Sequence, residues 1–325
     1  MKKRVVIDTD SGVDDALALL LALLSPELQV ESICTVSGNV PLEQATKNAA
    51  LILNLFDSKP PPILARGAAE PLKKGLITAQ SVHGWDGLGE LNRFKNSDGS
   101  PRYRYPQLPQ DLPDAVEVLL DLLKRYPDEL SLITLGPLTN LAEALVADRR
   151  CVKRLREVVI MGGAIRVSGN ITPAAEFNIF VDPHAAQRVF ESGLPIKLVP
   201  LDVTERVHLG PVEIENLAQE MDEPLGRFLF DATSKTREYM KQMRGVEAIL
   251  LHDPLAVGVA IDPSMVETAL LHVDVETNEG VTQGMTLADL RAIRDDLKQP
   301  ANLQAALEVD AKLFLAFLKE RLCPR

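Results

Sequence analysis

The sequence is poor in cysteine, and it lacks the spacing that would give its cysteines a structural role. Three cysteines, Cys34, Cys151 and Cys323, are widely separated among 325 residues. No Cys-X-X-Cys pair is present, and the number is odd, so neither a disulfide framework nor a zinc knuckle is expected. Free cysteines are typical of a reducing compartment, and we therefore expect a cytoplasmic protein.

Long hydrophobic segments are also missing. The longest apolar run, residues 16–24, is far shorter than the roughly 20 residues needed to span a bilayer. Basic residues open the chain at Lys2, Lys3 and Arg4, but only three apolar residues follow before Asp8. The hydrophobic region of a signal peptide is thus not present. We expect a protein without a membrane partner or a targeting segment.

Basic residues are fewer than acidic residues. The chain has 35 Lys and Arg against 46 Asp and Glu, a net charge of −11. Nucleic acids and anionic membranes require compensating basic side chains, so neither is expected as a partner. A small neutral substrate is compatible with this balance.

What the sequence contains is an alternation of short β-rich runs and longer helical patterns. The predicted strands cover residues 4–9, 29–36, 130–135, 157–161, 196–201 and 271–276. The predicted helices cover residues 14–24, 42–55, 114–125, 138–147, 182–192 and 303–318. Strands of nearly continuous Val, Ile and Leu are buried on both faces, as in a parallel sheet with helices on either side.

The predicted fold class is therefore α/β: an open, doubly wound, mostly parallel, Rossmann-like sheet flanked by helices. We expect one domain over residues 1–325, because no linker or repeat divides the chain. Residues 92–113, rich in Pro, Arg and Tyr, are predicted to form a surface loop. Residues 210–244 are predicted to be an added helical region.

Small and acidic residues follow the predicted strands. Asp10, Asn39, Gly136, Gly162 and Asp202 each lie at or just after the end of one. In an open α/β sheet, ligands bind at the carboxyl ends of the strands. The pattern therefore predicts a site at this edge of the sheet.

Four carboxylates, Asp8, Asp10, Asp14 and Asp15, crowd the first strand end. Acids in the first turn of a helix are stabilised by its dipole, so Asp14 and Asp15 alone have a purely structural explanation. That explanation does not cover Asp8 and Asp10, since Asp has poor strand propensity. Converging carboxylates favour a cation with oxygen ligands, Ca²⁺ or Mg²⁺.

Two acids at the end of a first strand also occur in haloacid dehalogenase-type phosphatases. Those enzymes have Thr or Val two residues after the second acid, where this chain has Gly12. A downstream Gly-Asp-X-X-X-Asp pair is not found either. The phosphatase, which would use Mg²⁺, remains an alternative.

The sequence resembles the inosine–uridine nucleoside hydrolase family through most of its length. The N-terminal motif of that family usually reads DTDPGxDDA, and here it reads DTDSGVDDA from Asp8 to Ala16. Further matching motifs follow in order: Ser37–Asn39, His83–Gly89, Gly136–Asn140, Met161–Gly163, Asn170–Asn178 and His252–Pro254. The one departure in the first motif, Ser11 in place of Pro, frees the backbone but removes no ligand.

The resemblance implies a Ca²⁺ site. Its ligands would be the carboxylates of Asp10, Asp15 and Asp253, together with the main-chain carbonyl of Leu135. The metal would activate a water molecule, and Asp10 would take its proton as general base. The expected reaction is hydrolysis of the N-glycosidic bond of a ribonucleoside to free base and ribose.

The resemblance also assigns substrate-binding residues. Those at the ribose hydroxyls are Asp14, Asn39, Asn178 and Asp253 for the 2′ and 3′ positions, and Asn170 and Glu176 for the 5′ position. Met161 would form the pocket floor beneath the sugar. Family members are commonly oligomers, so a homodimer or homotetramer is expected.

The leaving base is expected to meet His252 and Tyr239. His252 resembles the histidine proposed as general acid in one branch of the family, and its ordinary pKa near 6.5 suits proton delivery. The alternative is that His252 only lines the base pocket. Tyr239 would stack on the base. His83 either closes over the site or is a loop residue held by local hydrogen bonds. The sequence does not decide whether the enzyme prefers purine or pyrimidine nucleosides.

A third reading, beside hydrolase and phosphatase, is a nucleoside-binding protein without catalysis that descends from the enzyme. The complete set of catalytic groups argues against it. Release of free ribose in a metal-dependent manner would separate the three.

Overall fold

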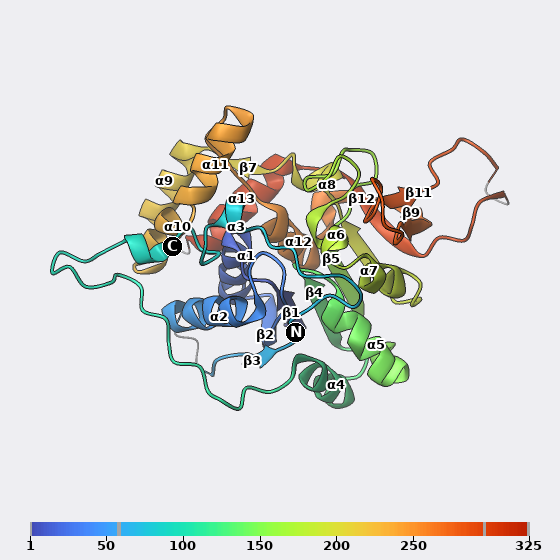
Figure 1. Ribbon diagram of the computed structural model, residues 1–325, viewed down its shortest axis with the longest axis horizontal. Helices are drawn as coiled ribbons and strands as arrows, with labels where there is room; N and C mark the ends of the chain where they lie inside the picture. Colours follow the sequence, from blue (N-terminus) through green and yellow to red (C-terminus); the bar gives the residue numbers. More distant parts are fainter. Residues whose placement is uncertain (1, 57–59, 295–296, 324–325) are drawn as a thin grey trace.

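An eight-stranded sheet forms the centre of the computed structural model, which describes residues 2–56, 60–294 and 297–323 (Figure 1). Its strands are β1 (Lys3–Thr9), β2 (Leu28–Thr35), β3 (Ile63–Arg66), β4 (Leu130–Thr134), β5 (Glu157–Met161), β6 (Ile196–Val199), β9 (Val266–Leu271) and β12 (Leu303–Val309). The order across the sheet is β3-β2-β1-β4-β5-β6-β12-β9. Neighbouring strands are parallel, except that β9 runs antiparallel to β12. The chain changes direction across the sheet between β1 and β4, which is where such sheets open a crevice for a ligand.

Helices cover both faces of the sheet. They are α1 (Val13–Leu24), α2 (Leu42–Phe56), α3 (Gln80–His83), α4 (Ala115–Arg125), α5 (Thr139–Val152), α6 (Phe177–Val181), α7 (Pro183–Phe190), α8 (Leu201–Thr204), α9 (Pro211–Glu220), α10 (Leu225–Ala232), α11 (Ser234–Arg244), α12 (His252–Ile261) and α13 (Ala311–Leu322). Short 3-10 turns lie at Leu91–Arg93 and Pro263–Met265, and two small ladders pair β7 (His208–Leu209) with β8 (Ile249–Leu250) and β10 (Val273–Val275) with β11 (Thr286–Ala288).

Burial of β1 on both faces explains its nearly continuous apolar sequence. Val5 and Ile7 pack into the core beneath α1, α2, α12 and α13. Val6, which lies between them, points to the opposite face and packs with α4, α5 and α7. Alternate side chains of a strand point to opposite faces, so each face receives an apolar layer. The predicted α/β architecture is confirmed.

The added helical region is confirmed as well. Residues 210–244 form α9, α10 and α11, which stand together beside α3 in Figure 1. The loop predicted over residues 92–113 contains only the end of a short 3-10 turn and isolated bridges. Its Arg102 and Tyr103 side chains both donate to the carboxylate of Asp231 in α10, at 2.5 and 2.8 Å. This loop is therefore anchored to the helical region.

The C-terminal part of the chain corrects the prediction. Residues 303–318, predicted as one helix, form β12 and then α13. The strand segment is rich in Ala, Leu, Gln and Glu, which favour helices, but pairing with β6 and β9 overrides that weak preference. Asp310 separates the two elements and caps α13 by accepting from the Leu313 amide at 3.0 Å.

Two further differences concern strands. The strand predicted over residues 271–276 is wrong in its extent, because β9 ends at Leu271 and β10 pairs only with β11, outside the central sheet. The edge strand β3 has no counterpart in the prediction. Among the described residues, no helix is long and apolar enough to cross a membrane.

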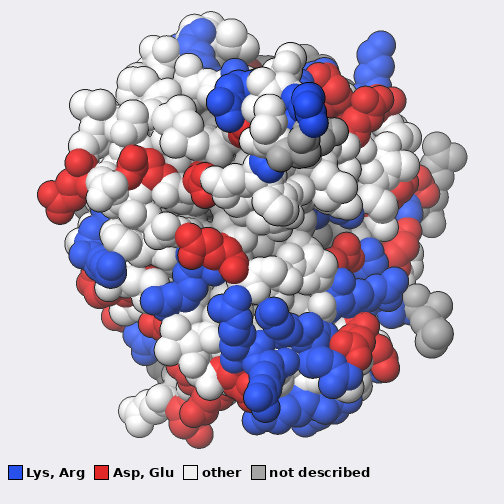
Figure 2. Space-filling view, turned by 90° about the vertical axis from the view of Figure 1, so that its right-hand side faces the viewer, with Lys and Arg blue, Asp and Glu red and all other residues white. Residues whose placement is uncertain are grey.

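Charge is unevenly spread over the surface. Although the net charge is −11, Lys and Arg side chains gather in the lower half of Figure 2, on the side of the molecule that carries α5 and α7. Arg149 and Arg150 in the last turn of α5 belong to this side. A crossover helix ends near the amino ends of the parallel strands, so these cations lie far from the acidic strand ends.

Candidate active site

The acidic turn lies at the carboxyl end of β1, beside the point where the sheet reverses direction. Asp10 follows the strand, and Gly12 is the N-cap residue of α1. Asp14 and Asp15 occupy the first turn of that helix, where the helix dipole favours negative charge. The sheet thus directs Asp10 toward the crevice, while α1 brings the other two carboxylates to it.

Ser11 gives the turn an unusual backbone. Its φ is 50°, in the left-handed region, which a proline, fixed near −65°, cannot enter. The Ser11 amide donates to Thr9 Oγ1 at 3.0 Å, and its carbonyl accepts from Asn48 Nδ2 at 2.9 Å. The turn is therefore held by hydrogen bonds on both sides of Ser11.

Asn39 holds two carboxylates in place. Its backbone amide and its Nδ2 donate to Asp10 at 2.6 and 3.0 Å, and Nδ2 also lies 3.1 Å from Asp15. Asp15 accepts in addition from the Gly12 amide at 2.8 Å. Asp10 and Asp15 are fully buried. The side-chain nitrogen of Asn39, a residue predicted at the ribose hydroxyls, thus donates to the acids.

Three aspartates of the site form a cluster of carboxylates that could bind a cation. Carboxylate oxygens of Asp14, Asp15 and Asp253 lie within 4.8 Å of one another. Burial and mutual repulsion raise the pKa of Asp14 to about 7 and hold the pKa of Asp10 and of Asp253 well above the usual range. Within the described residues no Lys or Arg forms an ion pair with any of the four, so oxygen ligands face one another without a countercharge.

The carboxylate cluster and the predicted metal ligands overlap in Asp15 and Asp253. The third carboxylate within 4.8 Å of these two is Asp14. Asp10 lies beside them, and its charge contributes to the raised pKa of Asp253. Both of its oxygens are turned toward Asn39.

Leu135, whose main-chain carbonyl is in the predicted ligand set, lies at the neighbouring strand end. Leu135 follows β4, and its amide donates to the carbonyl of Asp8 at 2.7 Å, which fixes the strand end next to β1. Its carbonyl accepts from Asn178 Nδ2 at 2.8 Å. Asp8 itself faces away from the cluster and accepts from Asn140 at 2.8 Å. Asp8 thus ties the end of β1 to α5 and does not belong to the acid cluster.

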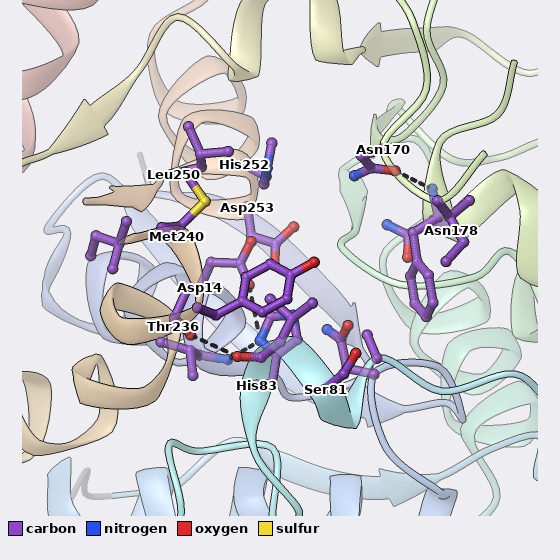
Figure 3. A pocket seen from close by; sticks show the side chains of 18 of the residues that line it. Asp14, Ser81, His83, Asn170, Asn178, Thr236, Met240, Leu250, His252 and Asp253 are labelled. Atoms are coloured by element: carbon purple, nitrogen blue, oxygen red, sulfur yellow. Dashed lines mark hydrogen bonds and ion pairs between the residues drawn. The ribbon is translucent and has the colours of Figure 1, made fainter. Parts of the chain in front are cut away.

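A cavity of about 390 Å³ opens above these groups. With the exception of the buried Asp10 and Asp15, every residue predicted for the site lines it. One side, which we call the strand-end wall, follows the ends of β1, β2, β4 and β5 and the segment into α6; it comprises Asp14, Asn39, Leu135, Met161, Asn170, Glu176 and Asn178. The opposite side, the helical wall, comprises Ser81 and Val82 of α3 and Thr236, Tyr239, Met240 and Met243 of α11. In Figure 3, Asn170 and Asn178 lie across the cavity from Met240, Leu250 and His252.

Glu176 is fixed by backbone donors. It caps α6, and its carboxylate accepts from the amides of Gly163, Asn178 and Ile179 at 3.0, 2.9 and 3.2 Å. Burial nevertheless raises its pKa. Asn170 Oδ1 accepts from the Phe177 amide at 2.9 Å, which leaves its Nδ2 toward the cavity. These two residues therefore present fixed polar atoms at one end of the strand-end wall.

His252 opens α12 on the other side of the cluster, next to Asp253. Its Nδ1 lies 2.7 Å from Thr204 Oγ1, at the end of α8. Burial, together with the charge of Arg244, lowers the pKa of His252 to about 3. The expectation of an ordinary pKa near 6.5 is therefore wrong for this environment. At neutral pH the ring is neutral and offers an N–H as a hydrogen-bond donor.

The sequence left two alternatives for His83, a residue that closes over the site or a loop residue held by local hydrogen bonds, and the structure has features of both. Its loop is held locally, because the carboxylate of Asp86 accepts from the amides of Leu88, Glu90 and Leu91 at 2.7–3.0 Å. The His83 ring nevertheless lines the cavity, and Nδ1 accepts from the Val13 amide at 3.1 Å. Burial lowers its pKa to about 4.

Sequence reasoning missed most of the helical wall. Met240, Met243 and Thr236 lie on one side of α11 and face the cavity, and Arg244 reaches it while paired with Glu205 at 2.9 Å. Spacing of three to four residues in a helix was the available signal, but such spacing is equally typical of ordinary packing. Tyr239 was the one residue of this helix predicted, and it does line the cavity.

Comparison with known proteins covers the whole chain. Residues 5–316 match the family described as inosine-uridine preferring nucleoside hydrolase. The pyrimidine-specific ribonucleoside hydrolase RihA of Photobacterium profundum is 35% identical over 323 residues, 99% of each protein. The solved plant nucleoside hydrolase PpNRh1 has a TM-score of 0.89 and 34% identity over 100% of both chains.

The relatives differ in the base that their names specify. A solved purine-preferring ribonucleoside hydrolase from Gardnerella vaginalis has a TM-score of 0.85 and 32% identity, covering 99% of this chain and 98% of its own. Likeness to this protein and to the pyrimidine-specific RihA is similar in extent. The comparisons favour neither the phosphatase nor the binding-protein alternative.

Proposed function

The chain belongs to the inosine-uridine preferring nucleoside hydrolase family and cleaves N-ribosyl bonds, and we propose that its substrates are ribonucleosides bound in the cavity between the two walls. In this proposal Ca²⁺ binds at the acid cluster. One observation carries the proposal. Asp14 and Asp253 line the cavity, the buried Asp10 and Asp15 lie beside them, and among the described residues no Lys or Arg forms an ion pair with any of these four acids.

The donor set fits Ca²⁺. Asp10, Asp15 and Asp253 with the carbonyl of Leu135 would hold it, and Asp14 lies close enough to share it. All of these ligands are oxygen atoms, which hard divalent cations prefer, and neither Cys nor a His nitrogen is needed. When bound, the cation neutralises the acids and lowers the pKa of a coordinated water.

Asp10 is the proposed general base. Its burial and its acidic neighbours keep the pKa well above the usual range, so the carboxylate has a higher affinity for a proton than an exposed Asp. The two hydrogen bonds from Asn39 hold it in one orientation. Asp10 is thereby fixed to accept the proton of the attacking water.

The strand-end wall binds the ribose in this proposal. Asp14 and Asp253 accept hydrogen bonds from the 2′ and 3′ hydroxyls, and Asn39 and Asn178 assist with the amide atoms not used on the acids and on Leu135. Asn170 and Glu176 meet the 5′ hydroxyl, and Met161 underlies the ring. Carboxylates around the sugar also stabilise the positive charge that develops in an oxocarbenium-like transition state.

The base lies toward the helical wall. Tyr239 stacks on it, and His252 donates the hydrogen bond of its free ring nitrogen to it as the N-glycosidic bond breaks. His83 closes the cavity beside Asp14, 3.9 Å from its carboxylate. Because His252 is neutral, its role is that of a hydrogen-bond donor to the departing base, whose proton is restored from solvent.

We place the enzyme in the cytoplasm as a homodimer or homotetramer. Cys34, Cys151 and Cys323 are all free, which fits a reducing compartment. Gel filtration with light scattering measures the assembly, and a monomeric mass would overturn this part.

Ribose release tests the function. The protein is incubated with uridine or inosine after EDTA treatment, with and without added Ca²⁺, and reducing sugar is measured. We expect ribose from at least one nucleoside only when the cation is restored. Equal ribose release before and after chelation would remove the metal from the proposal, and release of phosphate from a phosphomonoester without ribose release would restore the phosphatase.

A further inference from the structure

A hydrogen bond joins His252 to a residue that belongs to none of the motifs of the site. Thr204 Oγ1 lies 2.7 Å from His252 Nδ1, and the two residues are 48 positions apart in the chain. Thr204 is fully buried and does not line the cavity. It therefore cannot touch a substrate in this structure, and any effect on the reaction must pass through the imidazole.

The direction of this hydrogen bond follows from the surroundings of the hydroxyl. Within the described residues, Thr204 Oγ1 has no hydrogen-bond partner other than His252 Nδ1. A buried hydroxyl needs an acceptor for its hydrogen, and an unmet buried donor is costly. The hydroxyl thus donates to Nδ1, which must then carry the lone pair. In a neutral imidazole the hydrogen consequently lies on Nε2.

The backbone around both residues is rigid. Thr204 ends α8, and Asp202 in the same helix accepts from the amides of Ile165 and Arg166, both at 2.8 Å. On the other side, β7 and β8 form a ladder just before His252, and the Leu251 amide donates to the carbonyl of Val207 at 3.0 Å. The first contact ties α8 to the segment after β5, and the second ties the segment after α8 to the start of α12.

We propose that Thr204 is a positioning residue, which fixes the ring of His252 in the orientation and tautomer that presents Nε2–H to the leaving base. The inference rests on the proposed function, since it needs His252 to contact the base. The inference adds a residue that keeps the hydrogen of His252 on Nε2. With the opposite tautomer, Nε2 would present a lone pair to the base and could not donate a hydrogen bond.

Two substrates separate this role from a structural one. Uridine has a poor leaving group that benefits from a hydrogen-bond donor, whereas 4-nitrophenyl β-D-ribofuranoside releases a stable phenolate without one. We expect Thr204→Val to lower kcat for uridine by roughly 10- to 100-fold, part of the about 10²–10³ that one hydrogen-bond donor to a developing negative charge supplies. The nitrophenyl riboside should keep its kcat within about twofold, and KM for uridine should change little.

Four further variants complete the test. Thr204→Ser keeps the hydroxyl and should restore most of the kcat for uridine. His252→Ala should lose kcat for uridine, and adding Thr204→Val to it should cost nothing more, because a residue that acts only through His252 has no effect without it. Thr46→Val, which removes a buried hydroxyl bonded to the Leu42 carbonyl at 2.8 Å in α2, is the matched control for hydroxyl loss and should leave kcat unchanged.

NMR gives a readout that does not depend on turnover. The chain has five histidines, so the ¹⁵N signals of His252 are assigned by comparison with His252→Ala. Wild-type protein should show Nε2–H at neutral pH, and Thr204→Val should show a mixture of tautomers.

The outcomes are distinguishable. If His252→Ala keeps full activity on uridine, the proposed role of His252 fails and the inference fails with it. If His252→Ala loses activity but Thr204→Val does not, the inference alone is overturned. Equal losses for uridine and the nitrophenyl riboside in Thr204→Val would also overturn it, since they would indicate general disruption of the site.

Discussion

The two walls of the cavity are built in different ways. On the strand-end wall, backbone hydrogen bonds fix the polar side chains: Asn39 on Asp10, and three amides on Glu176. On the helical wall, Thr236, Tyr239, Met240 and Met243 project from α11. Of these four, only Thr236 makes a side-chain hydrogen bond, to the Val82 carbonyl at 3.4 Å, among the described residues. One wall is rigid and polar, and the other is mainly apolar and adaptable.

This difference suggests a division of labour. Sugar chemistry needs fixed hydrogen bonds at every hydroxyl and at the attacking water, because a small misplacement is costly in rate. Bases differ in size and shape, and Met side chains adapt to irregular partners. A rigid wall for ribose and an adaptable wall for the base also fit relatives that are pyrimidine-specific or purine-preferring by name on the same fold. Substitutions in the first wall should therefore change kcat, and those in the second should change KM.

The strongest test of the rigid wall is a missing hydroxyl. We expect 2′-deoxyuridine to have a kcat/KM about 10⁴-fold below that of uridine, because a site built to hydrogen-bond a hydroxyl is left with unpaired buried groups. Inosine and 2′-deoxyinosine should show a similar ratio if both are substrates, since the base lies on the other wall. Steady-state assays of ribose and deoxyribose release measure the ratios, and comparable values for uridine and 2′-deoxyuridine would contradict the role given to Asp14.

Asp10→Ala addresses the chemistry next to the strand-end wall, where Asn39 holds the buried Asp10. We expect kcat to fall by about 10³-fold, within the range for loss of a general base. Asp231→Ala is the matched control, since Asp231 is also a buried carboxylate, but it lies in α10 and accepts from Arg102 and Tyr103. The control should lower the melting temperature and keep kcat. An Asp10→Ala protein with more than a tenth of wild-type kcat would exclude Asp10 as the base.

The acid cluster predicts how stability responds to pH. Asp residues titrate near 3.9 in an unfolded chain, but burial and repulsion raise the pKa of Asp14 to about 7 in the folded protein. Between these values the folded state binds more protons than the unfolded chain, so raising the pH through this window destabilises the metal-free protein. Ca²⁺ requires deprotonated ligands and should offset the loss.

Thermal melting at pH 5 and pH 8, with and without Ca²⁺, measures this effect. We expect the metal-free protein to melt a few degrees lower at pH 8 than at pH 5, and Ca²⁺ to raise the melting temperature more at pH 8. In Asp15→Asn, which removes one charge from the cluster, both differences should shrink. An equal Ca²⁺ effect at the two pH values would mean that the cation does not bind at these acids.

The same division explains what the sequence could predict. Residues at the ends of β1, β2, β4 and β5 were predicted because the carboxyl ends of parallel strands meet at one edge, and their motifs resemble a family. Thr204 was not, because its partner His252 lies 48 residues away and neither motif nor spacing links them. Leu303–Val309 was assigned to a helix, since local propensity does not register pairing with β6 and β9.

The use of individual polar groups was also beyond the sequence. Asn39 and Asn178 are predicted at the sugar hydroxyls, and no sequence pattern indicates that their Nδ2 atoms donate to Asp10 and to the Leu135 carbonyl. The ordinary pKa near 6.5 assumed for His252 did not hold either, because burial lowers it to about 3. A motif names the residues of a site, whereas hydrogen-bond partners and burial are properties of the assembled fold.

The smallest expected effect belongs to the helical wall, and it tests whether that wall governs binding alone. Tyr239 lines the cavity from α11 and is only partly buried. Stacking of a base on an aromatic ring contributes about 1–3 kcal/mol, so Tyr239→Leu should raise KM for uridine about tenfold with kcat within about twofold. Tyr239→Phe keeps the ring and should change KM less than about twofold. A kcat loss in Tyr239→Leu that approaches that of Asp10→Ala would break the comparison, because it would place a group essential for the chemical step on the adaptable wall.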